Sequence, residues 1–280
     1  MKLIADSGST KTVWVLLESE KVTNTILTNG LNPYFHTSVS VEALLLSDLV
    51  PFIPCDHVQE IHFYGAGCST EKNNHIISGT LQKFFRNAAI HVYHDILGAA
   101  RSLFGNNSGI AGILGTGCNS CYYDGVNCFQ EVDSLGYLFG DEGAGSYLGK
   151  SWLSKYLKKQ APDDLKSAFD LEYKYSLSDI LHCLYNRPNP NRFLASFSEF
   201  LAPRQKHPFI HQLVKDAFLA FVNEQLTSYD QYQPIPVSFV GSIGFYYSDI
   251  LQEVMAEKKL TIGAIIQNPI EGLIHYHSNN

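Results

Sequence analysis

Apolar positions in residues 1–106 fall into short blocks that turn residues separate. Blocks rich in β-branched and aromatic side chains are typical of strands, and apolar residues spaced by three or four are typical of helices. On this basis we predict strands at 3–5, 13–17, 22–28, 61–64 and 90–93, and helices at 41–50 and 74–85. Their order along the chain is β-β-β-α-β-α-β.

The same cycle begins again after residue 107. We predict strands at 110–114, 120–123, 128–131, 237–240 and 262–266, and helices at 146–159 and 269–277. Between them, the apolar residues of 165–228 follow helical spacing and predict an all-helical stretch. The doubled pattern predicts an α/β fold of two similar βββαβαβ domains. Their predicted limits are 1–106, with the closing segment 268–280 packed on it, and 107–267, with a helical insertion at about 160–230.

Three glycine-rich turns follow apolar strands: DSGSTKT (6–12), GILGTGCNS (112–120) and FVGSIG (239–244). A single turn of this kind is weak evidence, because most of them only reverse the chain. Their order and spacing are more informative, since the second turn repeats the first about one hundred residues later. Two such phosphate-binding turns predict a nucleotide cleft between the two domains.

The first turn lies between two predicted strands and is therefore expected to be the tip of a hairpin. A tight turn can direct backbone N–H groups at a phosphate, and hydroxyl and lysine side chains add further donors. Asp6, just before the turn, is a candidate ligand for Mg²⁺ that is bound together with ATP. The candidate phosphate-binding residues are Gly8, Ser9, Thr10 and Lys11 in the first turn and Gly115, Thr116 and Gly117 in the second.

Two commoner nucleotide-binding motifs are missing from the sequence. It contains no GxxxxGK[ST], and no GxGxxG opens a helix after the first strand, which disfavours a P-loop enzyme and a dinucleotide-binding Rossmann domain. Further segments complete the pattern: GLNPYF (30–35), HDILGAARS (94–102) and GYLFGDEGAGSYLG (136–149). Together with the three turns, they resemble the BadF/BadG/BcrA/BcrD ATPase family, and especially its N-acetylglucosamine kinase branch. This resemblance implies the actin-like ATPase (ribonuclease H-like) fold of sugar kinases, Hsp70 and actin.

Composition agrees with a cytoplasmic enzyme of this size. The chain has 280 residues, of which 45% are hydrophobic and 17% charged, which is ordinary globular usage. The formal net charge of −7 disfavours nucleic acid and anionic membranes as partners. We find no signal peptide and no uncharged run of the ~18 residues that would span a bilayer.

The six cysteines raise the alternative of a metal or iron–sulfur site, because Cys118 and Cys121 form a C-x-x-C that Cys128 follows. Two features disfavour it. Cys118 lies in the second phosphate turn, and Asp124-Gly125 is a hairpin signal that would place Cys121 and Cys128 on paired strands. No fourth ligand stands nearby in sequence, so we expect free thiols.

Phosphoryl transfer requires a group that accepts the proton of the attacking hydroxyl. Asp95 is the candidate, because it follows a strand and opens a helix, where a carboxylate can project from a sheet edge. The alternative is a plain helix N-cap. The resemblance favours catalysis, since the matching Asp of the family's sugar kinases is the base.

Asp141 lies in the GDEG turn before a predicted helix, where the helix dipole alone also favours an acid. The resemblance places this Asp at the active site, so we assign it to sugar and Mg²⁺ positioning, with Glu142 as a weaker helper. Asn32, whose alternative is an ordinary Asn-Pro turn, resembles the sugar-contacting Asn of the family. The remaining candidates for the sugar pocket are Asn119, Ser120, Gly136 and Tyr137. The eukaryotic kinases have Trp where this chain has Tyr137, which leaves the exact sugar open.

In FVGSIG, we expect Gly241, Ser242 and Gly244 to admit the nucleoside close to the backbone. The predicted function is ATP-dependent phosphorylation of a hydroxyl, on C6, of an amino sugar or N-acetylhexosamine. One alternative is a BadF-type ATPase that acts as a conformational activator of a partner protein. Another is a sugar sensor without turnover, which the presence of Asp6, Asp95 and Asp141 disfavours. The sequence leaves a homodimer open.

Overall fold

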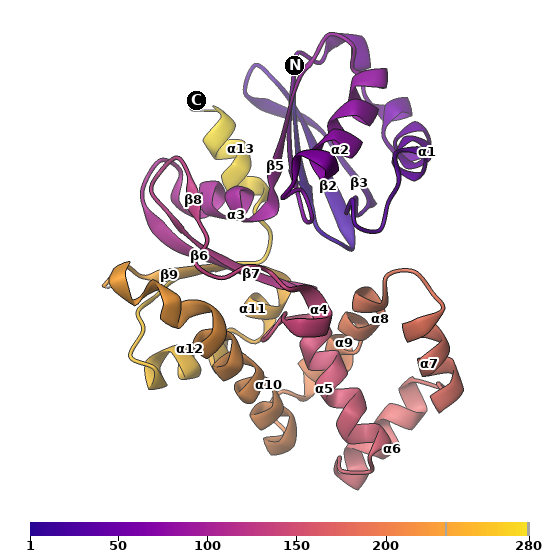
Figure 1. The fold of residues 1–280 in the computed structure, drawn as a ribbon, viewed down its shortest axis with the longest axis vertical. Coiled ribbons are helices and arrows are strands. Elements are labelled where there is room, and N and C mark those ends of the chain that lie inside the picture. The colour runs from indigo at the N-terminus through magenta and orange to yellow at the C-terminus, as the bar shows by residue number, and fades with distance from the viewer. Residues whose placement is uncertain (233, 279–280) are drawn as a thin grey trace. The chain divides into compact units, whose positions relative to one another are not determined.

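The computed structural model describes residues 1–232 and 234–278. Residues 233, 279 and 280, which fall within the predicted domains, lie outside the described residues. The chain divides into two compact units (Figure 1). Unit 1 comprises residues 1–108, 123–128 and 268–280, and unit 2 comprises residues 109–122 and 129–267.

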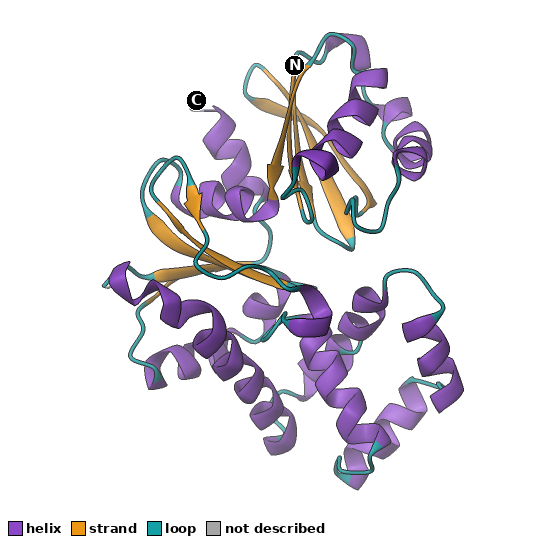
Figure 2. Cartoon of the chain, in the orientation of Figure 1, coloured by secondary structure: helices purple, strands orange, loops and turns teal. Residues whose placement is uncertain are grey.

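Each of two five-stranded sheets has its first strand in the centre, and the strand order is the same in both. Figure 2 shows the strands of both sheets in orange. The first sheet has the order β3-β2-β1-β4-β5, and the second has β8-β7-β6-β9-β10, when each is listed from its hairpin strand. In the first sheet, β1 pairs antiparallel with β2 and parallel with β4, which pairs parallel with β5. The α/β actin-like fold with two related halves is confirmed.

The strands begin and end close to the predicted positions. They are β1 Lys2–Ser7, β2 Lys11–Glu18, β3 Lys21–Asn29, β4 Glu60–Gly65, β5 Ala89–His94, β6 Gly109–Leu114, β7 Cys118–Tyr123, β8 Cys128–Phe129, β9 Val237–Val240 and β10 Ile262–Ile266. The strand predicted at 128–131 is thus only two residues long. The Asp124-Gly125 hairpin is confirmed: Gly125 has φ +104, and Asp124 Oδ1 accepts bonds from the N–H groups of Val126 and Asn127.

Helices cover both faces of the first sheet. On one face, Leu3, Ala5 and Trp14 pack against α1 and α2. On the other, Ile4, Val13 and Val15 pack with residues of α3 and α13. The helices of unit 1 are α1 Ser38–Asp48, α2 Glu71–Phe84, α3 Asp95–Phe104 and α13 Ile270–Ser278, with short 3₁₀ turns at Val50–Phe52 and Cys55–His57.

The helical stretch of unit 2 buries an aromatic core around Trp152, Phe169 and Phe200. These aromatic residues therefore serve packing. The helices of unit 2 are α4 Gly136–Phe139, α5 Gly145–Leu157, α6 Asp163–Glu172, α7 Leu177–Tyr185, α8 Pro190–Ser196, α9 Ser198–Leu201, α10 Pro208–Phe221, α11 Ser242–Tyr246 and α12 Ser248–Glu257, with 3₁₀ turns at Ala202–Arg204 and Thr227–Tyr232 and a π turn at Val222–Leu226.

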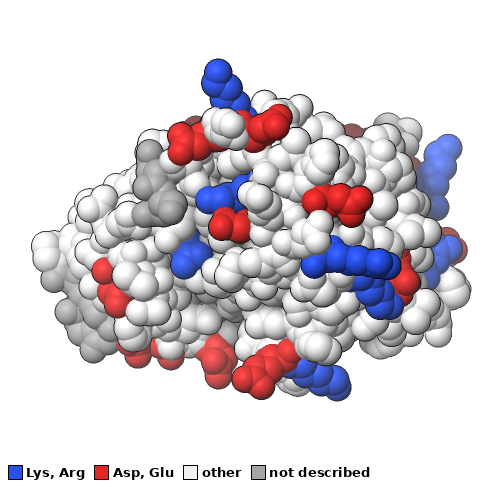
Figure 3. Space-filling view, turned by 90° about the horizontal axis from the view of Figure 1, so that it is seen from above, with Lys and Arg blue, Asp and Glu red and all other residues white. Residues whose placement is uncertain are grey.

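Charged side chains of both signs are interspersed on the face drawn in Figure 3. Within residues 1–232 and 234–278, no helix combines the length and apolarity that a bilayer crossing requires.

Candidate functional site

The first glycine-rich turn is the tip of the β1–β2 hairpin, as predicted. Gly8 N–H donates to Lys11 O at 3.0 Å and closes the turn. Gly30 packs against this turn. A Cβ built on Gly30 would lie 2.2 Å from Gly8 O, so a larger residue would displace the turn. Thr10 and Lys11 are exposed, and the tip of this turn therefore faces solvent.

Asp6 and Asp95 meet at one edge of the first sheet. Parallel pairing of β1 with β4 and of β4 with β5 brings the carboxyl ends of these strands together. Burial, with the negative charge of Asp95 added, raises the pKa of Asp6 to about 7, and Lys11 opposes this shift. The two carboxylates are therefore close enough to interact.

Asp95 is the first residue of α3, and the N-cap is His94, which makes no side-chain capping bond. The alternative of an N-cap is therefore wrong for Asp95. His94 Nε2 lies 3.2 Å from Asp95 Oδ1, and the Asp95 side chain keeps 22% of its surface exposed. It is thus held in place and also accessible to a ligand.

Asn32 lies beside the first turn and is nearly buried, with 7% of its surface exposed. Its Nδ2 donates to Ser9 Oγ at 3.2 Å, and its Oδ1 accepts a bond from Tyr34 N–H at 3.0 Å. The carboxamide therefore closes an Asx-type turn, as the Asn-Pro alternative predicted. It still has one N–H and one oxygen lone pair for a ligand.

The second glycine-rich turn joins β6 to β7, and Gly115 N–H donates to Gly117 O at 3.0 Å. The start of α5 braces this turn. Gly145 N–H donates to Gly115 O at 2.8 Å, and Ser146 N–H donates to Thr116 O at 3.0 Å. The turn is accordingly held from outside as well as by its own closing bond.

The side chain of Asp141 also helps to hold the second turn in place. Its Oδ1 accepts a bond from Cys118 N–H at 2.9 Å, and its Oδ2 accepts a bond from the Ser146 hydroxyl at 3.4 Å. Burial raises the pKa of Asp141 to about 6, although the bonds from Cys118 and Ser146 favour the carboxylate. Its backbone is left-handed, with φ +62. Asp141 is therefore part of the second turn's own structure.

The third glycine-rich turn packs directly on the second. Gly241 has φ +127, and a Cβ built on it would lie 2.2 Å from Leu114 O. Ser242 begins α11, and Gly244 lies within that helix, where its Cβ position would be 3.4 Å from Leu114 Cβ. The structure thus brings Gly241, Ser242 and Gly244 together with Gly115, Thr116 and Gly117.

The predicted sugar residues Asn119 and Ser120 lie in β7, and Gly136 and Tyr137 lie in α4. Asn119 Oδ1 accepts bonds from Ser120 N–H and Gln130 Nε2. The Ser120 hydroxyl is fully buried and bonds with Gln225 and Tyr229, because neighbouring strand residues point to opposite faces. The Ser120 hydroxyl thus already has two protein partners, and a shared sugar pocket for Asn119 and Ser120 stays a prediction. Gly136 and Tyr137 lie in α4, where Tyr137 is partly buried against the core.

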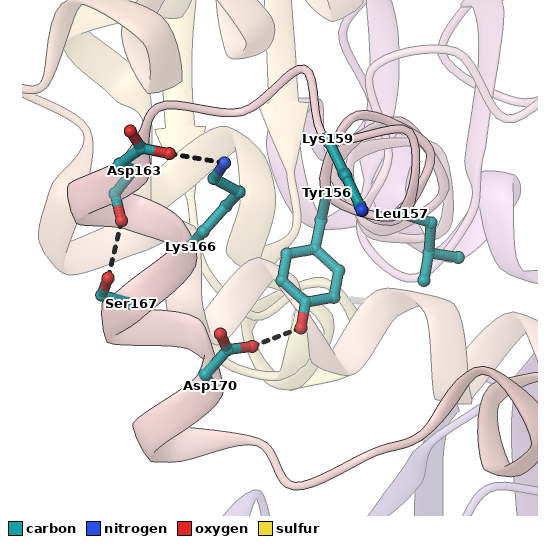
Figure 4. Close-up of a pocket in the computed structure, with 7 residues that line it drawn as sticks. All are labelled: Tyr156, Leu157, Lys159, Asp163, Lys166, Ser167 and Asp170. Carbon is teal, nitrogen blue, oxygen red and sulfur yellow. Dashed lines mark hydrogen bonds and ion pairs between the residues drawn. The ribbon is translucent and has the colours of Figure 1, made fainter.

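A cavity of about 510 Å³ lies elsewhere in unit 2, where the end of α5 meets α6 (Figure 4). Its polar side chains mostly bond with one another: Tyr156 with Asp170, Lys166 with Asp163, and the Ser167 hydroxyl with the Asp163 carbonyl. None of the predicted site residues lines it.

The cysteines are free thiols. In the part of the chain that the structure describes, no group of three or more His, Cys, Asp and Glu residues is arranged to hold a metal ion. A pair of carboxylates is enough for Mg²⁺, which is usually bound by one or two carboxylates together with phosphate oxygens and water. Asp6 fits this role, because burial and the charge of Asp95 disfavour its carboxylate, and a nearby cation would stabilise that carboxylate.

Three structural contributors were missed at the sequence level: Gly30, Gly67 and Ser146. Gly30 and Gly67 adjoin predicted residues that lie more than twenty positions away, and Ser146 bonds with Asp141, five positions before it. The one available signal was the glycine-rich GAGC segment (65–68), which follows the strand predicted at 61–64 as the other glycine-rich turns follow theirs.

No protein-family model matches the chain, and a search of curated proteins returned no match. Solved structures do match. A protein from Porphyromonas gingivalis, provisionally named an N-acetylglucosamine kinase, is 39% identical over 100% of this chain and 99% of its own, with a TM-score of 0.95.

Two other solved structures are less similar in sequence. One, from Chromobacterium violaceum and named provisionally in the same way, is 18% identical over 98% of both chains, with a TM-score of 0.69. A ROK family glucokinase from Streptomyces griseus, in complex with glucose and AMPPNP, is 12% identical over 98% of this chain and 97% of its own, with a TM-score of 0.58. At these identities the likeness concerns the fold alone.

Proposed function

Because the chain belongs to the N-acetylglucosamine kinase-like branch of the BadF/BadG/BcrA/BcrD ATPase family, within the actin-like ATPases, we propose that it phosphorylates the C6 hydroxyl of an N-acetylhexosamine such as N-acetylglucosamine. The coarser function, an ATP-dependent sugar kinase that transfers phosphate to an alcohol, follows from the family. The observation that carries the finer proposal is the 39% identity over the whole chain to the Porphyromonas gingivalis protein. The reaction belongs in the cytoplasm, where ATP is available.

Unit 1 carries the acceptor side of the proposed reaction. Asp95 is the base: its carboxylate takes the proton of the sugar hydroxyl as the hydroxyl oxygen forms a bond to the γ-phosphorus and the bond to the ADP oxygen breaks. His94 positions this carboxylate through the 3.2 Å contact. Asn32 contributes its remaining donor and acceptor to sugar recognition.

Unit 2 carries the nucleotide side. The Gly115–Gly117 turn is the proposed phosphate-binding turn, and Gly241, Ser242 and Gly244 leave room for the nucleoside beside the backbone. Asp6 in unit 1 is the proposed contact for Mg²⁺, which supplies neutralisation of phosphate charge when bound. Asp141 shapes the second turn and remains a weaker candidate for sugar and Mg²⁺, since both of its oxygens already accept bonds.

The rival function, activation of a partner protein by ATP hydrolysis, is not favoured, because the similar full-length structure is named as a sugar kinase. A homodimer remains a proposal without a structural observation behind it.

The test is sugar-dependent ADP release with Mg-ATP across a panel of amino sugars and hexoses. We expect strong stimulation by one N-acetylhexosamine and a phosphorylated product. Asp95→Asn should lower kcat by at least ~10²-fold, whereas Asp56→Asn, an exposed aspartate of the same unit, should not change it. ATP hydrolysis that is indifferent to every sugar and to Asp95 would contradict the proposed function.

A further inference from the structure

The turn between β4 and α2, residues 65–68, lies against Asn32. A Cβ built on Gly67 would be 2.3 Å from Asn32 Oδ1, 3.0 Å from Asn32 Cγ and 2.9 Å from Tyr34 Cδ2. The carboxamide of Asn32 therefore occupies the space that any other residue at position 67 would fill. Gly67 also has φ +79, a left-handed conformation that glycine adopts without strain.

The position of Gly67 is fixed from both sides. Asn73 Nδ2 donates to Gly67 O at 2.8 Å, and Asn73 N–H is itself held by Thr70 Oγ1. On the other side, Ala66 N–H donates to Ser7 O at 2.8 Å, which attaches the turn to the end of β1. Because this backbone is held firmly, an added Cβ would displace the Asn32 side chain before it displaced the turn.

The same turn also lies near the candidate base. Cys68 is buried, which raises the pKa of its thiol to about 12, and the charge of Asp95 adds to this shift. Residues 65–68 therefore lie close to both of the residues to which we assign the acceptor sugar.

We propose that Gly67 is a positioning residue for the acceptor sugar, because its missing Cβ lets the Asn32 carboxamide point its remaining N–H and lone pair at the substrate. This inference rests on the proposed function for its ligand, an acceptor with a hydroxyl or acetamido group. Asn32 also bonds with Ser9 of the first turn, so Gly67 indirectly supports the link between the sugar residue and that turn.

The kinetic test compares Gly67→Ala with Gly105→Ala. Gly105 lies in the same unit and has a similar φ of +60, but a Cβ built on it would meet no atom within 4 Å. Both variants place Ala at a positive φ, and only Gly67→Ala crowds Asn32. We expect Gly67→Ala to raise the sugar KM by about ten-fold, as loss of one well-formed hydrogen bond would, with a smaller change in the Mg-ATP KM. Gly105→Ala should leave the sugar KM unchanged.

A double variant tests whether the effect passes through Asn32. If Gly67 acts by positioning that residue, Asn32→Ala with Gly67→Ala should have the same sugar KM as Asn32→Ala alone. Additive increases, or equal increases for Gly67→Ala and Gly105→Ala, would overturn the inference.

A readout that needs no sugar separates this inference from the proposed function. The side-chain amide signals of Asn32 in a ¹H–¹⁵N spectrum, assigned by their loss in Asn32→Asp, should move in Gly67→Ala and remain in place in Gly105→Ala. Unmoved signals in Gly67→Ala would overturn the positioning role. Moved signals in a protein that phosphorylates no sugar would support the positioning role and refute the proposed function.

Discussion

The two hairpin turns have the same local design and differ in what surrounds them. Each is closed by a 3.0 Å backbone bond, from Gly8 to Lys11 O in the first and from Gly115 to Gly117 O in the second. Each also has a distant glycine packed on it, Gly30 on the first and Gly241 on the second. This repetition agrees with the equal strand orders of the two sheets.

The first turn is held from outside by two bonds, from Gly30 N–H to Thr10 O at 3.1 Å and from Asn32 Nδ2 to Ser9 Oγ at 3.2 Å. Because its tip is exposed and the second turn has more such bonds, we call the first turn open and the second braced. The tip of the first turn is exposed at Thr10 and Lys11. The second is bonded by Gly145, Ser146 and the buried carboxylate of Asp141. Two turns with similar sequences can therefore differ in how freely their backbone moves. We expect the open turn to adjust to its ligand and the braced turn to be formed before the ligand binds.

The largest effect should separate Gly241→Ala from Gly30→Ala. At position 241, Ala combines a φ of +127 with a Cβ 2.2 Å from Leu114 O in a braced turn, and we expect a loss of about 3 kcal/mol in the free energy of unfolding. Gly30→Ala should cost about 1–2 kcal/mol, since the exposed first turn can move away. Urea unfolding measures both, with Gly244→Ala as a control whose Cβ would be in ordinary contact, 3.4 Å from Leu114 Cβ. Equal losses for positions 30 and 241 would contradict the distinction between open and braced turns.

A second effect concerns Asp141. Asp141→Ala would leave the buried Cys118 N–H without its acceptor, which costs about 1–3 kcal/mol. Asp141→Asn keeps an oxygen at this place and tolerates the left-handed backbone, so we expect a loss below about 1 kcal/mol. Thermal or urea unfolding distinguishes the two. If both variants were equally destabilised, the charge of Asp141 and not its bond with Cys118 would hold the turn.

The smallest expected effect is a difference between the two units in their stability at acid pH. Burial lowers the pKa of His62 to about 4 and that of His277 to about 3; both lie in unit 1, near Glu60, Lys2, His91 and Arg101. The unfolded chain, with an ordinary histidine pKa of about 6.5, binds these protons first. The free energy of unfolding should therefore fall by about 1–2 kcal/mol as pH falls from about 7 to about 6.

Amide hydrogen exchange at pH 7 and pH 5 locates this loss. We expect amides of α13, where His277 packs against His62 with ring centroids 4.0 Å apart, to lose protection before those of α5. His277→Gln should flatten the pH dependence, and His57→Gln, an exposed histidine of unit 1, should not. Earlier loss in α5 would place the acid-sensitive element in unit 2.

The sequence by itself determined the order of the strands along the chain, the hairpin at the first turn, the doubled plan of the fold and the family. These features depend on local periodicity, on glycine in turns and on motifs that can be read in the chain. Helix starts were less accurate: α2 begins at Glu71 and not at residue 74. At this start, Thr70 Oγ1 accepts a bond from the backbone N–H of Asn73. This capping bond lets the helix begin before its first apolar residue.

The tertiary structure alone decided which side chains serve one another across long stretches of sequence. Ser120 bonds with Gln225 and Tyr229, more than a hundred residues away, and Asp141 braces a turn that lies 23 residues before it. Gly67 accommodates Asn32 for the same kind of reason. Such partners depend on how the elements pack, which leaves no trace in local periodicity. The roles of Gly67 and Ser146 are therefore visible only in the folded chain.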